Sequence, residues 1–380
     1  MSPDPAIHFF WRDRSVASRF RTGVSLHSHT LFSREGLTFI PRYAGRIPIV
    51  RQAVAARLRR YYRETGLTLD FSRAWWTPPL PPREAHDVEA RQIEEQLNLP
   101  ALVSLTDHDN IEAGLRLRVV ESTADSPLSV EWTVPFETSF FHLGVHNLPA
   151  SRAGAIMDEF RILTANPVPE RVQATLAELN QYPHVLIVCN HPLWDEKGIG
   201  IAQHQVLLER FLERFGRAIH ALELNGWRTW AENRSVIRIA RGLGLPLISG
   251  GDRHGREPNA NLNLTNASSF PGFVEEVRLK KRSHVLFMPQ YKESRTYRVL
   301  RTVCDILRHD ERHELGWAHW SDRIFYHKRG GGAESLTDLW SPRGAPVVVR
   351  SFIGLMTLLE KDSVRAALRS ALLDKERVVL

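Results

Sequence analysis

The amino-acid sequence predicts an α/β protein whose strands close into a barrel. Short apolar segments alternate with amphipathic helical segments from about residue 22 to residue 290, and strands separated by helices are typical of parallel βαβ units. Seven candidate strands in this length favour a barrel over a small open sheet, although the pattern is also compatible with an open sheet.

Each expected strand is a short apolar run bounded by polar or turn-forming residues. In chain order they are Gly23–Leu26, Ala101–Leu105, Leu128–Trp132, Ser139–Val145, Val185–Cys189, Ile219–Leu222 and Pro246–Ser249. Amphipathic helices are expected between several of them, at Arg171–Asn180, Gln205–Phe215 and Ser235–Leu243.

Two regions fall outside this alternation and read as additions to the barrel. Residues 42–100 form a helical insertion that contains a basic helix, Arg51–Arg63, followed by a proline-rich break. This helix either contacts nucleic acid or a phosphate-rich ligand, or presents a solvated face, and the second interpretation is preferred. Beyond residue 290 the chain is helix-rich. We therefore expect a barrel at 22–290 and a C-terminal extension at 291–380.

Composition restricts the class of protein. Fifty basic and 43 acidic residues leave a net charge of +7, which suits an anionic substrate such as a phosphate ester and is compatible with nucleic acid. The two cysteines, Cys189 and Cys304, exclude a disulfide framework or a cysteine-based zinc site. The N-terminal residues lack a signal-peptide apolar segment, and Val347–Leu359 is too short to span a bilayer. We expect a cytoplasmic protein that does not enter the membrane.

Histidine and acidic residues follow the expected strands one after another. His27 and His29 come directly after the first strand, and alternate residues of an extended chain point to the same side, so both imidazoles can reach one metal ion. The later ends carry Asp107, His108, Asp109, Glu131, His142, His191, Asp252 and His254. Strand ends of a parallel barrel share one mouth, and burying ionisable groups unpaired is costly, so the repetition predicts a metal site there. For at least one of Asp107 and Asp109, capping of the helix near Ile111 is the preferred interpretation.

These motifs resemble the PHP family, the polymerase and histidinol phosphatase superfamily of metal-dependent phosphoesterases. The matching segments occur in the family's order within residues 22–256: Leu26–Thr30, Leu105–Gly114, Val130–Thr133, Phe141–Gly144, Asn190–Pro192, Glu223–Asn225 and Gly250–His254. The resemblance implies a distorted, TIM-like (β/α)7 barrel of the PHP type that holds two or three divalent ions. Histidine and carboxylate ligands suit Mn, Zn and Fe alike.

The resemblance also implies a set of metal ligands. His27 and His29 would bind one ion with Asp252, Glu131 would bridge it to a second, and His142 and His191 would complete that second site. A third site would use His108 and His254 with an acidic residue of the first loop. The family usually has Ser-Asp-Gly where this chain has Ser33-Arg34-Glu35-Gly36, so either Glu35 supplies that carboxylate or Arg34 takes its place and disfavours a third ion.

The expected activity is hydrolysis of a phosphate ester by metal-activated water. Arg253 would hold the phosphate or else point outward, and His108 or His254 would protonate the leaving oxygen. A phosphorylated small molecule, a nucleotide and an oligonucleotide end are all candidate substrates. One alternative is an amide or C–N hydrolase. The position of Glu131 argues against it, because such an enzyme is expected to have a bridging lysine carbamate there. The other is a catalytically silent module that binds metal or nucleic acid, against which the nearly complete ligand set argues.

The tryptophans allow two interpretations. Trp75 with Trp76, and Trp227 with Trp230, have the aromatic rings needed to stack on bases. Packing in the protein core is the preferred role for both pairs.

Overall fold

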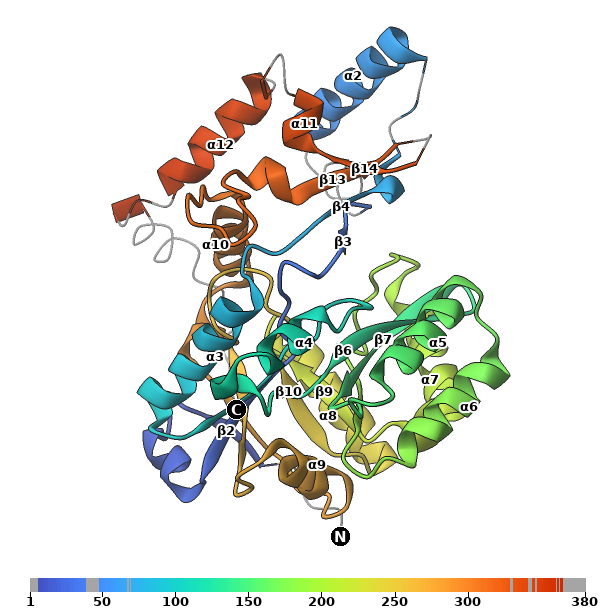
Figure 1. The fold of residues 1–380 in the computed structure, drawn as a ribbon, viewed down its shortest axis with the longest axis vertical. Helices are drawn as coiled ribbons and strands as arrows, with labels where there is room; N and C mark the ends of the chain where they lie inside the picture. Colours follow the sequence, from blue (N-terminus) through green and yellow to red (C-terminus); the bar gives the residue numbers. More distant parts are fainter. Residues whose placement is uncertain are drawn as a thin grey trace.

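The described residues of the chain form a mixed α/β fold with three sheets (Figure 1). The structure, a computed structural model, describes residues 6–38, 48–66, 68, 70–328, 331–340, 344–345, 347–359, 361 and 363–364. The first five-stranded sheet has the order β1 (Ala6–Phe9), β12 (His284–Phe287), β11 (Asn261–Thr265), β2 (Thr22–Leu26) and β5 (Ala101–Ser104). The second has the order β10 (Leu247–Gly250), β9 (Ala221–Asn225), β8 (Leu186–Cys189), β7 (Ser139–His146) and β6 (Val130–Phe136).

The strand pairing is only partly parallel. The pairs β2–β5, β8–β9 and β9–β10 are parallel, as expected, but β6–β7 and β7–β8 are antiparallel. Only Glu137 and Thr138 separate β6 from β7, and a link of two residues makes a hairpin because a parallel crossover needs a dozen or more. The expectation of parallel βαβ units was therefore wrong for β6 and β7.

The two large sheets meet at isolated bridges and do not pair into one continuous barrel among the described residues. The bridges join Ser28 to Arg253 and His108 to Glu131, just beyond the ends of β2, β10 and β5 and near the start of β6. Three strands that the sequence did not predict, β1, β11 and β12, extend the first sheet on its other side. The bridges bring the predicted ligand segments to one place.

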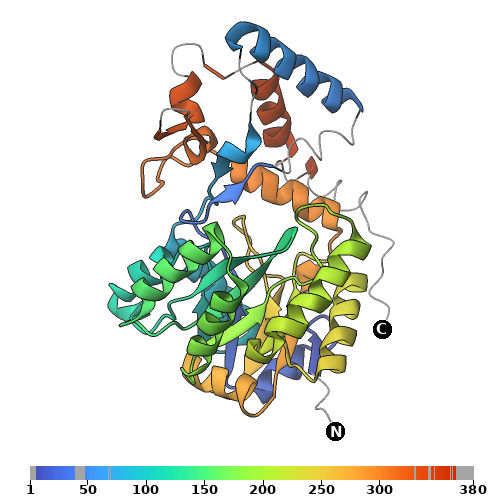
Figure 2. The same cartoon turned by 90° about the vertical axis from the view of Figure 1, so that its right-hand side faces the viewer.

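Helices cover the outer faces of both sheets (Figure 2). They are α3 (Pro82–Leu97), α4 (Glu112–Arg118), α5 (Ala153–Ala165), α6 (Pro169–Asn180), α7 (Ile201–Phe215), α8 (Trp230–Leu243) and α9 (Phe270–Arg278), and the three expected helices lie within α6, α7 and α8. Against β6, the ring of Phe160 from α5 stacks on Trp132 at 4.0 Å with an interplanar angle of 3°. Cys189 is a buried strand residue in this core, and neither it nor Cys304 forms a disulfide.

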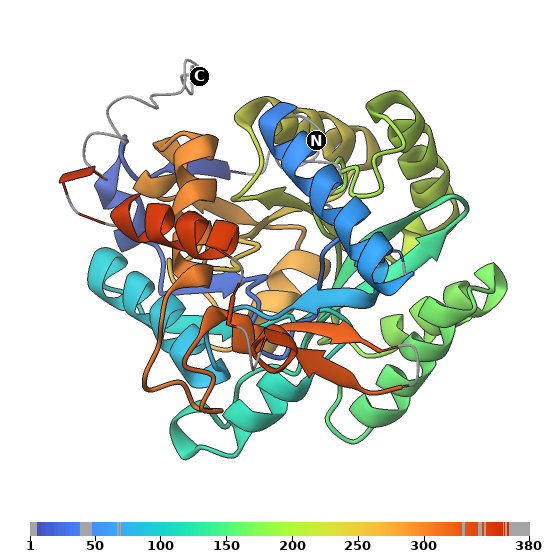
Figure 3. The same ribbon diagram turned by 90° about the horizontal axis from the view of Figure 1, so that it is seen from above.

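A third sheet joins the insertion to the C-terminal extension. Its order is β14 (Ala333–Ser335), β13 (Ile324–His327), β4 (Ala74–Trp76) and β3 (Glu35–Gly36). With α2 (Pro48–Thr65), α11 (Leu336–Trp340) and α12 (Val347–Leu359) it forms what we call the upper lobe, which lies above the large sheets in Figure 1 and over them in Figure 3. Helix α10 (Arg295–Leu307) lies between the upper lobe and these sheets. Two stretches remote in sequence thus build one layer.

The remaining elements are short 3-10 helices, at Arg14–Arg19, Phe71–Arg73, Glu121–Thr123, Gly216–Ala218, Pro289–Lys292 and Trp320–Arg323. The expected basic helix corresponds to α2, where Arg59, Arg60 and Arg63 are exposed and Arg60 pairs with Glu64 at 2.6 Å. A solvated face is the simpler account of these arginines. Within the described ranges, no helix is both long and apolar enough to cross a membrane.

Candidate metal centre

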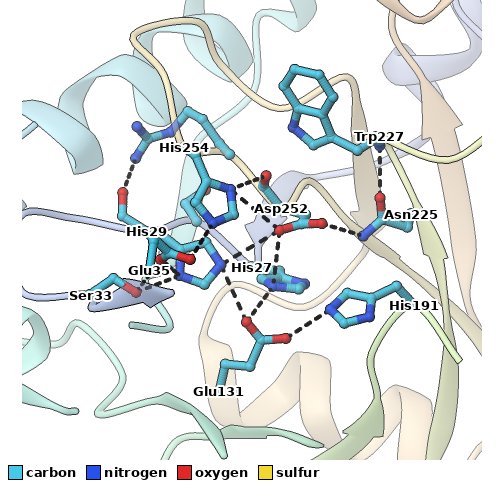
Figure 4. Close-up of polar contacts among 12 residues, drawn as sticks. His27, His29, Ser33, Glu35, Glu131, His191, Asn225, Trp227, Asp252 and His254 are labelled. Carbon is cyan, nitrogen blue, oxygen red and sulfur yellow. Dashed lines mark hydrogen bonds and ion pairs between the residues drawn. The ribbon is translucent and has the colours of Figure 1, made fainter. Parts of the chain in front are cut away.

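The nine residues predicted as metal ligands lie together where the two large sheets meet. Figure 4 labels all of them except His108 and His142. They form four overlapping groups in which one ligand atom per residue lies within 4.8 Å of the others. The groups are His27, His29 and Asp252; His27, Glu131 and His191; His108, Glu131 and His142; and His29, Glu35, His108 and His254. We call the last one the Glu35 group.

Glu131 is the centre of the cluster. Its carboxylate is fully buried and lies 3.0 Å from Nε2 of His27 and 3.1 Å from Nε2 of His191. Three more imidazoles lie within 3.5 Å of it, those of His29, His108 and His142. Burial acts to raise the pKa of Glu131, but the facing histidines outweigh it and hold that pKa well below its usual range. Glu131 is therefore an anion shared among several nitrogen donors.

Glu35, and not Arg34, supplies the carboxylate of the first loop. Its Oε2 atom lies 3.2 Å from Nε2 of His254 and 3.5 Å from Nε2 of His108. The guanidinium of Arg34 instead lies over the ring of Trp75, 5.3 Å from its centroid. Burial acts to lower the pKa of His108, but Glu35 and Glu131 raise it to about 9. The positive charge that would disfavour an ion is thus directed away from the Glu35 group.

Glu223 orients His27, a role that the sequence did not predict. Its Oε2 atom lies 2.6 Å from Nδ1 of His27, and its Oε1 atom accepts from Nδ2 of Asn225 at 2.6 Å and from the amide of His191 at 3.2 Å. A carboxylate that holds one imidazole nitrogen fixes the tautomer and leaves the other nitrogen for a metal. Gly250 permits this approach, because a Cβ there would lie 2.0 Å from the Glu223 carboxylate. The signal in the sequence was the Glu223–Asn225 motif at the end of β9.

His29 provides the test of whether a cation fits. The hydroxyl of Ser33 donates its single proton to Glu35 at 2.6 Å, so it accepts from Nδ1–H of His29 at 3.1 Å. In the neutral ring this leaves Nε2 of His29 with a lone pair, buried and without a hydrogen-bond partner. Its neighbours are carboxylate oxygens, of Glu131 at 3.3 Å and of Asp252 at 3.6 Å. A cation satisfies this lone pair and the oxygens together, so the residues fit a metal ion.

Three ligand residues lie on unusual backbone. His27, His191 and Asp252 have φ angles of +62°, +26° and +55°, in the left-handed region. Such conformations cost on the order of 1–3 kcal/mol each and concentrate at functional sites. The strands therefore end abruptly here, and the turn directs the ligand side chains toward one another.

Arg253 lies on the opposite side of the ligand segment. Its side chain is buried, and its donors contact the carboxylate of Glu89 at 2.8 Å and the carbonyls of Gly255 at 2.7 Å and His29 at 3.2 Å. All of these partners belong to the protein scaffold. The donors of Arg253 thus bind protein acceptors, which fits the alternative in which this side chain points outward.

The two aspartates beside His108 do not cap the following helix. Asp107 accepts from the amide and hydroxyl of Thr30, at 2.5 and 2.7 Å, and Asp109 accepts from the amide of Thr133 at 2.9 Å. The side chain of Asn110 instead accepts from the first-turn amide of α4 at 2.7 Å. The capping interpretation was wrong, because both carboxylates bind the neighbouring segments and hold the loop that carries His108.

Arg228 brings a cation to the centre that the sequence analysis missed. One of its nitrogens lies 3.5 Å from Oδ2 of Asp252, and its guanidinium lies 3.7 Å from the centroid of the Trp194 ring. The side chain is 9% exposed, and its Nε atom is buried without a hydrogen-bond partner. Arg228 lies three residues past the end of β9, and a basic residue just past a strand end was the available signal.

The tryptophans differ in their surroundings. Trp230 is buried in the core against Phe9 and Phe287. Trp227 is only partly buried and lies above the cluster in Figure 4, with the guanidinium of Arg298 4.7 Å from its centroid. Core packing is confirmed for Trp230 and not for Trp227.

Comparisons with known proteins leave the family open. No protein-family model and no curated protein matches the chain. Solved structures similar to it include an amidohydrolase from Chromobacterium violaceum with bound sulfate and no metal, at 17% identity over 47% of this chain and 83% of that chain, with a TM-score of 0.34. PsfC from Pseudomonas syringae PB-5123 is 14% identical over 72% of this chain and 93% of its own, with a TM-score of 0.38. A candidate metal-dependent phosphoesterase from Bifidobacterium adolescentis is 11% identical over 62% of this chain and 88% of its own, with a TM-score of 0.31.

The geometry of the site is therefore the basis for assigning its chemistry, since likenesses at these TM-scores carry no argument. In each of four groups, imidazole nitrogens and carboxylate oxygens from buried or partly buried residues lie within 4.8 Å of one another. This donor set fits the binding of divalent metal ions.

Proposed function

We propose that the chain is a metal-dependent phosphoesterase of the PHP type. The observation that carries the proposal is the convergence of all nine expected ligands, from seven separate segments of the chain, around two buried carboxylates. The ligands assigned to Mn, Zn or Fe are His27, His29, Glu35, His108, Glu131, His142, His191, Asp252 and His254. Two ions are assigned to the groups that contain Glu131 or Asp252, and a third to the Glu35 group.

The domain boundaries belong to the same proposal. Residues 22–290 and strand β1 form the metal-binding unit. The insertion at 42–100 interrupts this unit, and residues 291–380 are an extension. We describe the strands around the centre as a distorted barrel, which the bridges at Ser28 and His108 support.

When bound, the ions supply a water of lowered pKa and neutralise the charge that develops on a transferred phosphoryl group. The protein's own residues orient the reactants. Glu131 holds neighbouring ligands in one unit, and Glu223 keeps Nε2 of His27 directed inward. His108 and His254 would serve as ligands beside Glu35. Where that group holds no ion, the imidazolium form of His254 would be the acid for the leaving oxygen.

Arg228 supports an anionic substrate over a neutral amide. Its guanidinium is buried beside Asp252 yet keeps an unsatisfied nitrogen, and a phosphate oxygen would satisfy it. We therefore assign to Arg228 the phosphate contact that was expected of Arg253. Its substitution by glutamine is expected to raise KM for a phosphate ester by roughly 10- to 100-fold, the 1.5–3 kcal/mol of a charged hydrogen bond.

The experiment combines metal analysis with a substrate panel. Protein purified without chelator is assayed for Mn, Zn and Fe and then for hydrolysis of a phosphomonoester, a phosphodiester, a short oligonucleotide and an amide. The His27→Ala/His29→Ala variant is expected to lose turnover and metal, and His309→Ala, an exposed histidine, is the matched control. Turnover of the amide alone would establish the alternative hydrolase. Metal without any turnover would favour a silent binding module, and the absence of bound metal after reconstitution would refute the ligand assignment.

A further inference from the structure

The Glu35 group differs from the other three groups in how its ligands are held. His29 and His108 follow β2 and β5 of the first large sheet, but Glu35 belongs to β3 of the small sheet, and His254 lies on the loop after β10. Both of these ligands depend on residues of the C-terminal extension, 291–380.

Glu35 is held through β4 by a strand of the extension. Strand β3 has only two residues, which pair with Trp75 and Trp76 of β4. The other edge of β4 pairs with β13, where Phe325 stacks on Trp75 with ring centroids 5.4 Å apart and an interplanar angle of 19°. A two-stranded ribbon is marginal in water, so without β13 the pairing that positions Glu35 loses its support.

His254 is held by helix α10 and the loop that follows it. Two residues beyond His254, the amide of Arg256 donates to the carboxylate of Asp305 at 3.0 Å, and its guanidinium binds Asp310. Asp305 belongs to α10, which lies under the upper lobe. From β4, the ring of Trp76 lies 6.0 Å from the ring of His254. Successive side chains of a strand point to opposite faces, so the ring of Trp75 faces the extension and the ring of Trp76 faces the metal centre.

We propose that the C-terminal extension is the positioning element for the Glu35 group, and that an ion bound there fastens the upper lobe to the core. The inference rests on the metal binding proposed above. Since two of the four ligands come from the core and two are set by the extension, ion binding and lobe docking favour each other by the same free energy. The other ions, whose ligands lie in or just after strands of the large sheets, are assigned no such dependence on the extension.

The experiment compares two full-length double variants, one changed at contacts of the extension and one changed at exposed positions. The Phe325→Ala/Asp305→Ala variant removes the ring on Trp75 and the acceptor of the Arg256 amide. Its matched control, Phe352→Ala/Asp158→Ala, removes the same side-chain types at exposed positions. Equilibrium dialysis against Mn²⁺ with elemental analysis then gives the number of ions bound and the affinity of each.

We expect the first variant to bind one ion about 10- to 100-fold more weakly, the range for lost support of a ligand, while the other ions bind as in the wild type. The control variant should bind all ions normally. If the first variant binds its third ion with unchanged affinity, or binds every ion with equally reduced affinity, the inference is overturned while the proposed function stays intact. A wild-type chain that binds two ions would also overturn the inference alone, and one that binds none would overturn both.

A second measurement keeps the inference testable if that variant does not fold. Hydrogen exchange of the amides in β4 and β13 is followed in the wild type and in Glu35→Gln, with and without Mn²⁺. Exchange should slow about tenfold or more on adding Mn²⁺ to the wild type and should change little in Glu35→Gln. Equal protection of these amides in both proteins would contradict the coupling.

Discussion

Replacing Glu223 by glutamine tests how the centre prepares His27 for a metal ion. The carboxylate is 1% exposed and accepts three hydrogen bonds, from Nδ1 of His27 and from the donors of Asn225 and His191. Glutamine has the same shape but offers one acceptor oxygen and one NH2 group. Whichever way the amide turns, its NH2 group faces at least one of these donors.

The consequence for His27 follows from this donor count. If the glutamine oxygen faces Asn225 and His191, its NH2 group faces Nδ1 of His27, which must then lose its proton and carry it on Nε2. A protonated Nε2 cannot bind a metal. If the amide turns the other way, two donors lose their acceptor in the core. Loss of a residue that orients a ligand weakens metal binding by 10- to 100-fold, about 1.4–2.7 kcal/mol.

Competition with a chromophoric chelator measures this change as the dissociation constant of the tightest ion. The control is Glu276→Gln, a carboxylate of α9 that accepts from Thr265 at 2.6 Å and lies outside the ligand groups. Unchanged metal affinity in Glu223→Gln would refute the reasoning about the His27 tautomer. An equal loss in the control would show that any removed carboxylate weakens binding through net charge.

Three further predictions concern the scaffold. Gly250→Ala places a Cβ 2.0 Å from the Glu223 carboxylate, so the metal content of the protein should fall. The free energy of unfolding, measured in urea, should fall by about 1–3 kcal/mol. Phe160→Ala removes the ring stacked on Trp132 and should lower the free energy of unfolding by about 3–5 kcal/mol, while the folded fraction keeps its metal affinity. Burial lowers the pKa of His220 to about 3. The buried neutral ring therefore contributes fully to the stability of the fold above pH 6.5, the usual pKa of histidine in an unfolded chain. As the pH falls from 6.5 towards 3, the unfolded chain binds a proton that the folded chain does not, and the free energy of unfolding drops by at most about 1.4 kcal/mol per pH unit. His220→Asn should flatten that slope in urea titrations between pH 7 and 4.5; a slope equal to the wild type's would contradict the assignment.

The candidate ligands were the part of this protein most visible in its sequence. His27, His29 and the later strand-end residues could be assigned because short apolar runs end at polar groups whose burial is costly unless something pairs with them. The existence and approximate position of strands follow from the local hydrophobic pattern, so six of the seven expected strands lie by most of their own length within observed strands. The donor types then fit a metal without any knowledge of the contacts.

Strand direction and side-chain orientation were decided by tertiary structure. The apolar pattern of β6 and β7 is the same for parallel and antiparallel pairing, and only the two-residue turn between them requires a hairpin. The sequence left Arg34 and Glu35 as alternatives because both lie on one short segment. Pairing of β3 with β4 turns Glu35 inward and stacks Arg34 on Trp75.

The pairing of strands from the insertion and the extension could not be predicted from the local sequence pattern. Strand β4 lies more than 200 residues before β13, and the two pair through backbone groups that carry no sequence signature. The orienting role of Glu223 was not predicted for a related reason. A carboxylate that hydrogen-bonds a candidate ligand such as His27 and a carboxylate that would bind the metal itself differ only in position. Residue types thus determined which chemistry the chain can perform, and long-range contacts decided which groups face one another, because hydrophobic periodicity records burial and not partners.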